Sequence, residues 1–288
     1  MHPNRKILAM ADMSLMRVLL FTPATHPEYI AKAAGSGADG LVIDLEDGVA
    51  LEAKDTARAN LLAVMNKPRP ADNKLVWCVR LNHIETRPGL ADLLALAGQG
   101  DRLDAVMLPK VESPHEVEIA AKHLAITSPR IIALIETGRG LEHAAAIAAH
   151  PQVAAIAFGG ADLAADLHAE LAWEPMLWPR SRIVQAAAAS GIPAFDVPFL
   201  DIHDTDGLRK EALAAKRLGY GCKLAIHPAQ VAPIKAVFAP SPDELARAHR
   251  IVEAYAAAKG AACQVDGKMV DVPVWKAALR TVHLAAAT

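Results

Sequence analysis

The feature that most constrains the fold is a series of short apolar runs separated by longer, alanine-rich stretches with helical periodicity. No run exceeds eight residues, which fits strands buried on both faces of a parallel sheet. Eight such β–α units within about 215 residues match the size of a (β/α)8 barrel. A doubly wound parallel sheet could use the same units, but the number eight favours the TIM barrel. The runs cover residues 18–23, 41–47, 75–82, 105–111, 131–137, 154–160, 193–200 and 224–228.

Composition excludes several functional classes. Of the 288 residues, 53% are hydrophobic and 22% are charged, so the chain can bury a large core and is not intrinsically disordered. It has 30 Lys and Arg against 32 Asp and Glu. Because there is no basic surplus, we expect no nucleic-acid partner.

Three observations favour a cytoplasmic protein. No apolar run reaches the roughly 18 residues of a membrane span, so no membrane partner is expected. The N-terminal segment carries Asp12 inside its apolar stretch and makes a poor signal peptide. Cys78, Cys222 and Cys263 are widely spaced and show no zinc-site pattern, and each lies in or beside an apolar run, which predicts buried free thiols in a reducing compartment.

The chain divides into three expected regions. Residues 1–16 should form a loose N-terminal extension, and residues 17–240 the catalytic barrel. Residues 241–288 should form a C-terminal extension of helix, hairpin and helix. Since this last region is too small to fold alone, we expect it to pack on the barrel or on a neighbouring subunit.

Local signals support this account of the extension. The sequence Ser241-Pro242-Asp243-Glu244 is typical of a helix start, and it predicts a helix over residues 243–259. Asp266-Gly267 predicts the turn of a β-hairpin. A last helix should follow and continue through Leu284.

Acidic side chains end the second apolar run. In this fold, chemistry takes place at the carboxyl ends of the strands. Asp44, Glu46 and Asp47 lie there, and alternation puts Asp44 and Glu46 on one face of the strand. Like charges packed together need a cation or hydrogen bonds to compensate them, so this cluster is a candidate for function. The alternative is a solvated strand end.

Two cationic residues follow on the next two runs. Arg80 lies inside a buried stretch, where its guanidinium could bind a substrate carboxylate or pair with the acids of the second run. Lys110 ends the fourth run, and it could serve as a substrate cation or a Schiff-base nucleophile. We favour Lys110 as an ion-pair partner of the barrel carboxylates.

A pair of acids on neighbouring runs suggests a metal site. Glu136 ends a wholly apolar fifth run, and Asp162 follows two glycines after the sixth. Two carboxylates that leave positions open for water and substrate oxygens suit Mg²⁺, and Mn²⁺ would also fit. The alternatives are an ion pair for Glu136 and a helix cap for Asp162.

Other polar residues on the runs are less informative. Asp196 on the seventh run is a further candidate for substrate binding. His227 on the eighth run is better explained as a hydrogen-bonded structural residue. The chain has no G-x-S-x-G, P-loop or G-x-G-x-x-G sequence, which removes the common hydrolase and nucleotide-fold interpretations.

From about Arg17 onward, the motifs together resemble the citrate lyase β-subunit-like proteins of the HpcH/HpaI aldolase superfamily. Each motif alone is weak, but their order along the chain is specific. They are Leu19-Leu20-Phe21-Thr22-Pro23, Asp44-Leu45-Glu46-Asp47-Gly48-Val49, Val79-Arg80-Leu81-Asn82, Met107-Leu108-Pro109-Lys110-Val111-Glu112-Ser113, Ile135-Glu136-Thr137, Phe158-Gly159-Gly160-Ala161-Asp162 and Ile226-His227-Pro228-Ala229-Gln230.

The resemblance implies a (β/α)8 barrel, usually a homotrimer or a dimer of trimers, that makes or breaks a C–C bond in CoA thioesters with Mg²⁺. It places Glu136 and Asp162 at the metal-ligand positions and Arg80 at the substrate-binding arginine. The acidic cluster of the second run, together with Lys110, would lie beside the metal.

The resemblance also implies contacts to substrate or CoA for Phe21 and Lys32. Some relatives carry Tyr where this chain has Phe21, so a hydroxyl contact is missing here. The tail Gly267-Lys268-Met269-Val270-Asp271-Val272-Pro273 is similar to that of malyl-CoA and citramalyl-CoA lyases, where the aspartate is catalytic and enters from an adjacent subunit. Without the resemblance, Asp271 would be read as a helix cap.

The expected function is a lyase that cleaves a 3-hydroxyacyl-CoA such as (3S)-citramalyl-CoA to acetyl-CoA and pyruvate. Three alternatives remain. The first is cleavage of malyl-CoA or β-methylmalyl-CoA, which releases glyoxylate. The second is hydrolysis of a malyl-CoA thioester, and the third is a catalytically silent subunit that binds an acyl-carrier partner.

Overall fold

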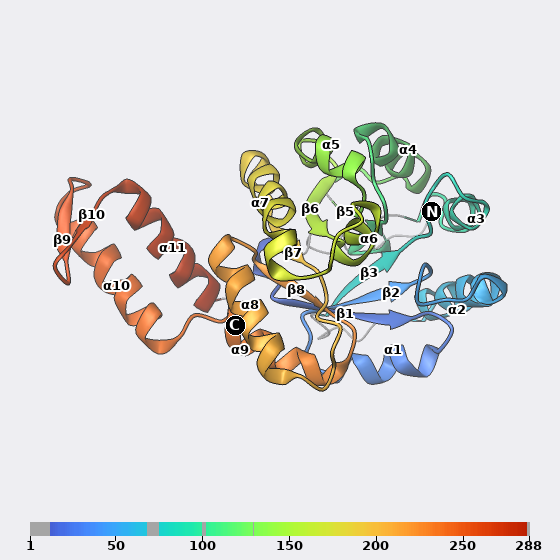
Figure 1. Cartoon of the computed structure of the whole chain (residues 1–288), viewed down its shortest axis with the longest axis horizontal. Coiled ribbons are helices and arrows are strands. Elements are labelled where there is room, and N and C mark those ends of the chain that lie inside the picture. The colour runs from blue at the N-terminus through green and yellow to red at the C-terminus, as the bar shows by residue number, and fades with distance from the viewer. Residues whose placement is uncertain (1–11, 68–74, 100–101, 129, 287–288) are drawn as a thin grey trace, which may run out of the picture. The chain divides into compact units, whose positions relative to one another are not determined.

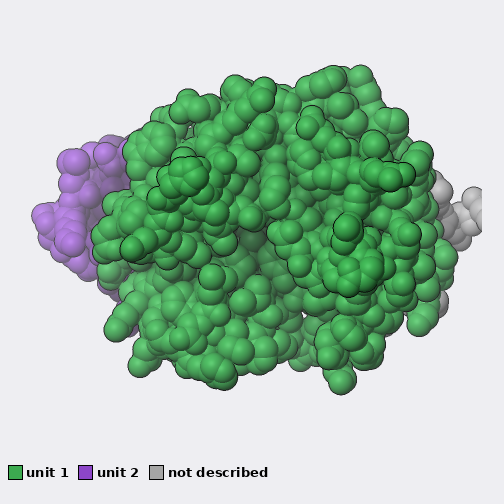
Figure 2. All heavy atoms as spheres, turned by 45° about the vertical axis from the view of Figure 1, so that its right-hand side comes forward, with its two compact units in different colours: residues 1–235 green, residues 236–288 purple. Residues whose placement is uncertain are grey.

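The computed structural model describes residues 12–67, 75–99, 102–128 and 130–286. The chain divides into two compact units, residues 1–235 and 236–288, which Figure 2 shows in different colours. Among the described residues, no helix is both long enough and apolar enough to cross a membrane.

The first unit contains a closed barrel of eight parallel strands, in which each strand pairs with its sequence neighbours and β8 returns to β1. The expected TIM barrel is therefore confirmed. Most of the helices that follow the strands lie around the outside of the sheet (Figure 1). The strands are β1 (Val18–Pro23), β2 (Gly40–Asp44), β3 (Val76–Arg80), β4 (Ala105–Leu108), β5 (Ile131–Ile135), β6 (Val153–Phe158), β7 (Ala194–Asp196) and β8 (Cys222–Ala225).

Helices separate the strands as the periodicity predicts. Three of them, α3, α5 and α8, begin with the same device, in which a Thr or Asp side chain accepts a hydrogen bond from a glycine N–H three residues later. The helices of this unit are α1 (Pro27–Ala33), α2 (Lys54–Met65), α3 (Arg87–Ala95), α4 (Pro114–Leu124), α5 (Gly138–Ala148), α6 (Gly160–Asp166), α7 (Trp173–Ser190) and α8 (Thr205–Leu218), and α9 (Val231–Phe238) crosses the unit boundary.

Strand alternation builds the barrel interior in layers. Inward-facing apolar side chains from every strand form one buried cluster that includes Val42, Cys78 and Leu134. Two residues further along these strands, the inward positions are taken by Asp44, Arg80 and Glu136. The apolar core thus ends in a charged layer at the carboxyl end of the barrel.

The N-terminal segment is ordered earlier than expected. Residues 1–11 of the predicted loose extension lie outside the described residues. Met13–Leu15 forms a short 3-10 helix capped by Asp12, and Met13 is buried in the barrel cluster. Because this side chain contributes to the core, residues 13–16 belong with the barrel.

The second unit has the expected order of elements: α10 (Pro242–Ala257), a hairpin of β9 (Cys263–Val265) and β10 (Lys268–Val270), and α11 (Val272–Ala286). Ser241 and Glu244 form the reciprocal cap that the sequence predicts. Asp266 and Gly267 both have positive φ, as the predicted tight turn requires. Tyr255 stacks on Trp275 in a small apolar cluster within this unit, so it has a core of its own.

A buried ion network reinforces β7, the shortest strand of the barrel. Asp196 of β7 and Lys223 of β8 are register partners, and both are fully buried. The Lys223 ammonium lies 2.6 Å from Asp196 and 2.7 Å from Glu211 of α8. Arg180 of α7 donates to Asp196 at 3.1 Å, and its guanidinium packs against the rings of Phe158 and Trp173. Two strands and two helices are thereby joined.

Breaking this network should destabilise the barrel. Lys223→Met leaves the carboxylate of Asp196 buried with one cation fewer, so the free energy of unfolding should fall by about 3–5 kcal/mol. Urea denaturation of the full chain measures this loss. Lys210→Met on the exposed face of α8 is the control, for which we expect a change below about 0.5 kcal/mol. Equal stability of the two variants would contradict the assignment.

Candidate active site

A cavity of about 390 Å³ opens at the carboxyl end of the barrel. Its walls are apolar side chains, among them Phe21, Leu134 and Phe158. The charged residues that line it are Asp44, Asp47, Arg80, Glu136 and Asp162. Every one of these charged residues was a candidate from the sequence, so the fold brings five of the predicted polar residues to one cavity.

Asp44 and Arg80 form the central pair of this charged layer. They are register partners on β2 and β3. The Arg80 guanidinium donates from Nε to Asp44 Oδ1 and from Nη2 to Asp44 Oδ2, both at 2.7 Å. Asp44 also accepts the backbone N–H groups of Glu46 and Gly48, each at 2.9 Å. One buried carboxylate therefore fixes both the arginine and the loop after β2.

Arg80 keeps donor capacity for a ligand. Its Nη1 lies 3.0 Å from Glu46 Oε2. A guanidinium has five N–H groups, and the hydrogen bonds to Asp44 use two of them. The Phe21 ring packs against the guanidinium, with its centroid 4.6 Å from Cζ. The expected ion pair with the acids of the second run is present, and the arginine still faces the cavity.

Glu46 and Lys110 form a second ion pair. The Lys110 Nζ lies 2.6 Å from Glu46 Oε1 and 3.5 Å from Asp47 Oδ2. Burial raises the pKa of Glu46, while the charge of Arg80 and the hydrogen bond from Lys110 lower it in part. Lys110 is thus the ion-pair partner of the barrel carboxylates that we favoured from the sequence.

Lys110 also contacts Glu136 through its backbone. Its φ is +51°, in the left-handed region that non-glycine residues rarely occupy. In this conformation the Lys110 N–H donates to Glu136 Oε2 at 2.9 Å. The main chain and the side chain of one residue therefore touch different carboxylates of the site.

Glu136 is a buried carboxylate whose surroundings disfavour its negative charge. The residue is 3% exposed. Burial raises the pKa of Glu136 well above the usual range, and the negative charges of Glu46 and Asp162 raise it further. The positive charges of Lys110 and Arg80 offset this rise in part. A Cβ at Gly159 would overlap the Glu136 side chain, so the glycine leaves room for this carboxylate.

Asp162 lies in the first turn of α6. Its side chain is 44% exposed, and its Oδ2 lies 3.8 Å from Lys110 Nζ. No cap hydrogen bond from Asp162 is found at the start of α6, where Gly159 is the N-cap residue. This open carboxylate is free to bind a ligand in the cavity.

The donor set fits a divalent cation. Among the described residues, the site contains the five carboxylates of Asp44, Glu46, Asp47, Glu136 and Asp162. The nearby cations are Arg80, Lys110 and, behind the loop after β2, Lys54. Burial raises the pKa of Glu136 and repulsion from Glu46 and Asp162 adds to it, and a bound divalent ion would offset this repulsion. Within the described ranges, no group of three His, Cys, Asp or Glu side chains is arranged around one metal position. Glu136 and Asp162 would therefore hold a metal together with water or substrate oxygens.

The prediction that Asp196 binds substrate is wrong. Phe195 points into the barrel, so the next side chain along β7 points outward to α7 and α8. There Asp196 is fully buried in the ion network with Arg180 and Lys223. When a strand is only three residues long, the sequence pattern does not show which face of the sheet a single acidic side chain takes.

Two further predicted residues lie outside the cavity lining. Lys32 is exposed on α1, where its ammonium lies 5.8 Å from the Tyr29 ring centroid. Asp271, in the second unit, accepts a hydrogen bond from the Val274 N–H at 3.3 Å and so caps α11. His227 caps a short helix through the Ala229 N–H, in line with its predicted structural role.

Sequence reasoning missed two residues that support the site. The Lys54 ammonium donates to the carbonyl oxygens of Leu45 and Glu46, at 2.8 and 2.6 Å. Asn82 donates to the Leu45 carbonyl at 2.9 Å. Asn82 could have been found as a polar residue ending the third run, whereas Lys54 lies in an ordinary helix and gives no signal.

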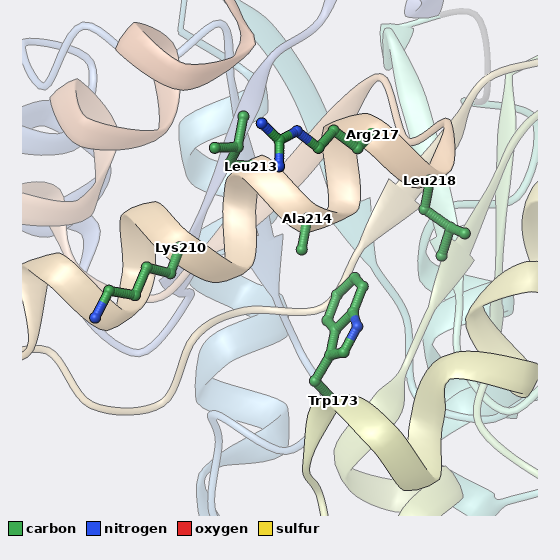
Figure 3. A pocket seen from close by; sticks show the side chains of 6 residues that line it. All are labelled: Trp173, Lys210, Leu213, Ala214, Arg217 and Leu218. Carbon is green, nitrogen blue, oxygen red and sulfur yellow. The ribbon is translucent and has the colours of Figure 1, made fainter.

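A second hollow lies between α7 and α8, where the Trp173 ring faces Ala214 (Figure 3). Lys210, Leu213, Arg217 and Leu218 complete its lining. It contains no carboxylate, and it does not resemble the charged cavity of the barrel.

Comparisons with known proteins identify the family of this chain. The profile of the HpcH/HpaI aldolase/citrate lyase family matches residues 17–228. The chain is 39% identical to a citrate lyase subunit beta-like protein of Mycobacterium tuberculosis, over 88% of this chain and 90% of that protein. It is 31% identical to human mitochondrial citramalyl-CoA lyase, over 93% of this chain and 85% of that protein.

Its fold matches the crystal structure of CitE from Mycobacterium tuberculosis in complex with magnesium, acetoacetate and coenzyme A, with a TM-score of 0.79 and 36% identity. The match covers 94% of this chain and 98% of that chain. The chain therefore belongs to the HpcH/HpaI aldolase/citrate lyase family.

Proposed function

We propose that this protein is a Mg²⁺-dependent lyase that cleaves the C–C bond of a 3-hydroxyacyl-CoA thioester. The proposed substrate is (3S)-citramalyl-CoA, which gives acetyl-CoA and pyruvate. The proposed form is a cytoplasmic homotrimer, in which the C-terminal extension of each subunit packs on a neighbour. The observation that carries the proposal is the meeting of Glu136, Asp162 and Arg80 at one cavity.

In this proposal Glu136 and Asp162 hold the metal, and Mn²⁺ could replace Mg²⁺. Bound there, the ion would act as a Lewis acid toward the hydroxyl and carboxylate oxygens of the substrate. Glu136 is held in place by the Lys110 N–H, and Asp162 is open to the cavity. Asp44, Glu46 and Asp47 support the site from the loop after β2.

Arg80 binds the oxygen that gains negative charge in the reaction. Its guanidinium is fixed by Asp44, so its remaining N–H groups are oriented before substrate arrives. The Phe21 ring is the apolar contact beside it. Lys32, exposed on α1, is available to the phosphate groups of CoA.

The chemical step needs two proton transfers. The substrate hydroxyl loses its proton to a base at the rim of the cavity. The electron pair of its O–H bond then forms the C=O bond of the keto acid. The electrons of the broken C–C bond pass to acetyl-CoA, which leaves as an enolate. Asp271 of a neighbouring subunit then protonates the enolate carbon, and in reverse it removes that proton.

One alternative has support of its own. The chain is 35% identical to L-malyl-CoA/beta-methylmalyl-CoA lyase of Cereibacter sphaeroides, over 89% of this chain and 90% of that protein. Malyl-CoA and citramalyl-CoA differ by one methyl group, a difference worth only about 1–3 kcal/mol in a pocket. Product analysis with citramalyl-, malyl- and β-methylmalyl-CoA separates the two. Free CoA without acetyl-CoA would indicate a thioester hydrolase. If none of the three substrates were turned over, the result would indicate a carrier-binding subunit.

Removal of one metal ligand should abolish metal-dependent turnover. Glu136→Gln keeps the shape of the side chain but removes the charge that would bind the ion, so both Mg²⁺ affinity and kcat should fall by orders of magnitude. Calorimetric titration with MgCl₂ and a product assay measure the two quantities. Glu116→Gln, a buried carboxylate outside the cavity lining, is the control. Full turnover of the wild type in excess chelator would refute the metal requirement.

Arg80→Lys should lower kcat/KM by orders of magnitude. A lysine ammonium cannot hold both oxygens of Asp44 and a substrate oxygen at once, because it lacks the planar fork. Arg130→Lys is a matched control, since Arg130 is equally buried but precedes β5 at the amino end of the barrel. If Arg80→Lys retained wild-type kcat/KM, Arg80 would be a structural residue only.

Mixed oligomers test whether Asp271 works across subunits. A general acid or base contributes typically about 10²–10⁴-fold, so Asp271→Asn should be nearly inactive while still binding metal and substrate. Arg80→Lys and Asp271→Asn subunits should regain part of the activity when they co-assemble, because some neighbours then combine an intact barrel with an intact Asp271. Hybrids that form and remain inactive would mean that Asp271 acts in its own subunit or only caps α11.

A further inference from the structure

Lys110 has a backbone conformation that needs an explanation. A left-handed φ strains the backbone of a residue that carries a side chain, and such strain persists where the surroundings impose it. Glycine would relieve it, yet position 110 holds lysine. Ala125, His168, Lys259 and Asp266 have a positive φ as well, so the contacts of the Lys110 side chain are what show its contribution.

That contribution is a positive charge in the middle of the rim carboxylates. The Lys110 ammonium lies 2.6 Å from Glu46, 3.5 Å from Asp47 and 3.8 Å from Asp162. Its side chain is 31% exposed, so it also borders solvent. The hydrogen bond to Glu46 and the surrounding carboxylates raise the pKa of Lys110 against the effect of burial, so the ammonium is charged at neutral pH.

The charge should act oppositely on the two ligands of the cavity. The ammonium repels a divalent cation, and it also competes with that cation for the Asp162 carboxylate. It attracts the anionic oxygens of a keto acid. The charge of Arg80 is already paired with Asp44 and Glu46, whereas Lys110 adds a second positive charge beside Asp162.

We propose that the Lys110 ammonium sets the charge of this site, weakening its hold on the metal ion and strengthening its hold on the anionic keto-acid portion of the substrate. The inference rests on the proposed metal role of Glu136 and Asp162. Lys110 thereby acts through the neighbouring charges as a positioning residue, while its N–H keeps Glu136 in place.

Lys110→Gln isolates the charge, because it keeps a side chain of similar length and the backbone N–H. Without Lys110, one more carboxylate charge is uncompensated within a few ångströms of the metal. Mg²⁺ should therefore bind about tenfold more tightly, and pyruvate in saturating Mg²⁺ about tenfold more weakly. Isothermal titration with MgCl₂, then with pyruvate, measures both affinities without turnover.

Three companion variants complete the experiment. Lys110→Arg keeps the charge, so both affinities should stay within about threefold of the wild type. Lys110→Gly should shift both affinities as Lys110→Gln does, but should unfold at a higher temperature than Lys110→Gln because glycine relieves the backbone strain. Lys235→Gln is the matched surface control. Lys235 is 33% exposed and pairs with Asp39 at 2.8 Å before β2, at the other end of the barrel.

The signs of the two shifts decide the outcome. Tighter Mg²⁺ binding with weaker pyruvate binding in Lys110→Gln supports the proposal. Unchanged affinities, or a joint loss of both, overturn it, because a merely structural lysine would disturb both ligands alike. A wild-type protein that binds no Mg²⁺ would instead overturn the proposed function, and this inference with it.

Discussion

The bidentate pair between Asp44 and Arg80 is the interaction on which the rest of the site depends. It joins β2 to β3 at register partners, at the level where the apolar interior ends. Asp44 then fixes the loop after β2 through two backbone N–H groups, and that loop presents Glu46 to Lys110. Lys110 in turn holds Glu136 through its own N–H. A chain of contacts thus runs from one buried ion pair across β2–β5.

This order has an energetic cost that a binding site can use. Burial disfavours the negative charges of Glu46 and Glu136, and repulsion from neighbouring carboxylates adds to this, so the pKa values of both groups are raised. A cation that enters the cavity relieves part of this repulsion, so part of its binding free energy comes from strain already present in the protein. The network around Arg180 and Lys223 serves the opposite purpose, because its one buried carboxylate, Asp196, contacts both cations at hydrogen-bond distance. One barrel therefore contains a charged cluster that needs a ligand and another that needs none.

The sequence predicted the barrel and most of the site for one physical reason. Parallel strands bring their carboxyl ends to the same rim, so polar residues ending the apolar runs had to meet, and Asp44, Arg80, Lys110, Glu136 and Asp162 do. Strand faces were harder to predict. The run around Asp196 is apolar throughout, and β7 covers only three of its residues, so alternation gave no direction. The left-handed turn at Lys110 could not be foreseen either, because lysine is not a residue that favours such a conformation.

The cavity is lined by charged residues and by apolar walls, and the two parts should have different roles. The charged residues bear on the type of reaction, and the apolar walls bear on which substrate fits. Charges that stabilise a developing oxyanion act on every 3-hydroxyacyl thioester alike, whereas a methyl group is sensed only by packing. The apolar wall includes Leu134, Phe158, Val197 and Leu224. Phe158 packs against Arg180, and Val197 accepts a hydrogen bond from Lys223, so the buried ion network sets the position of two wall residues. Under the proposed function, selection between pyruvate and glyoxylate as the released acid would depend on the packing behind β6–β8, and not on the carboxylates of the cavity.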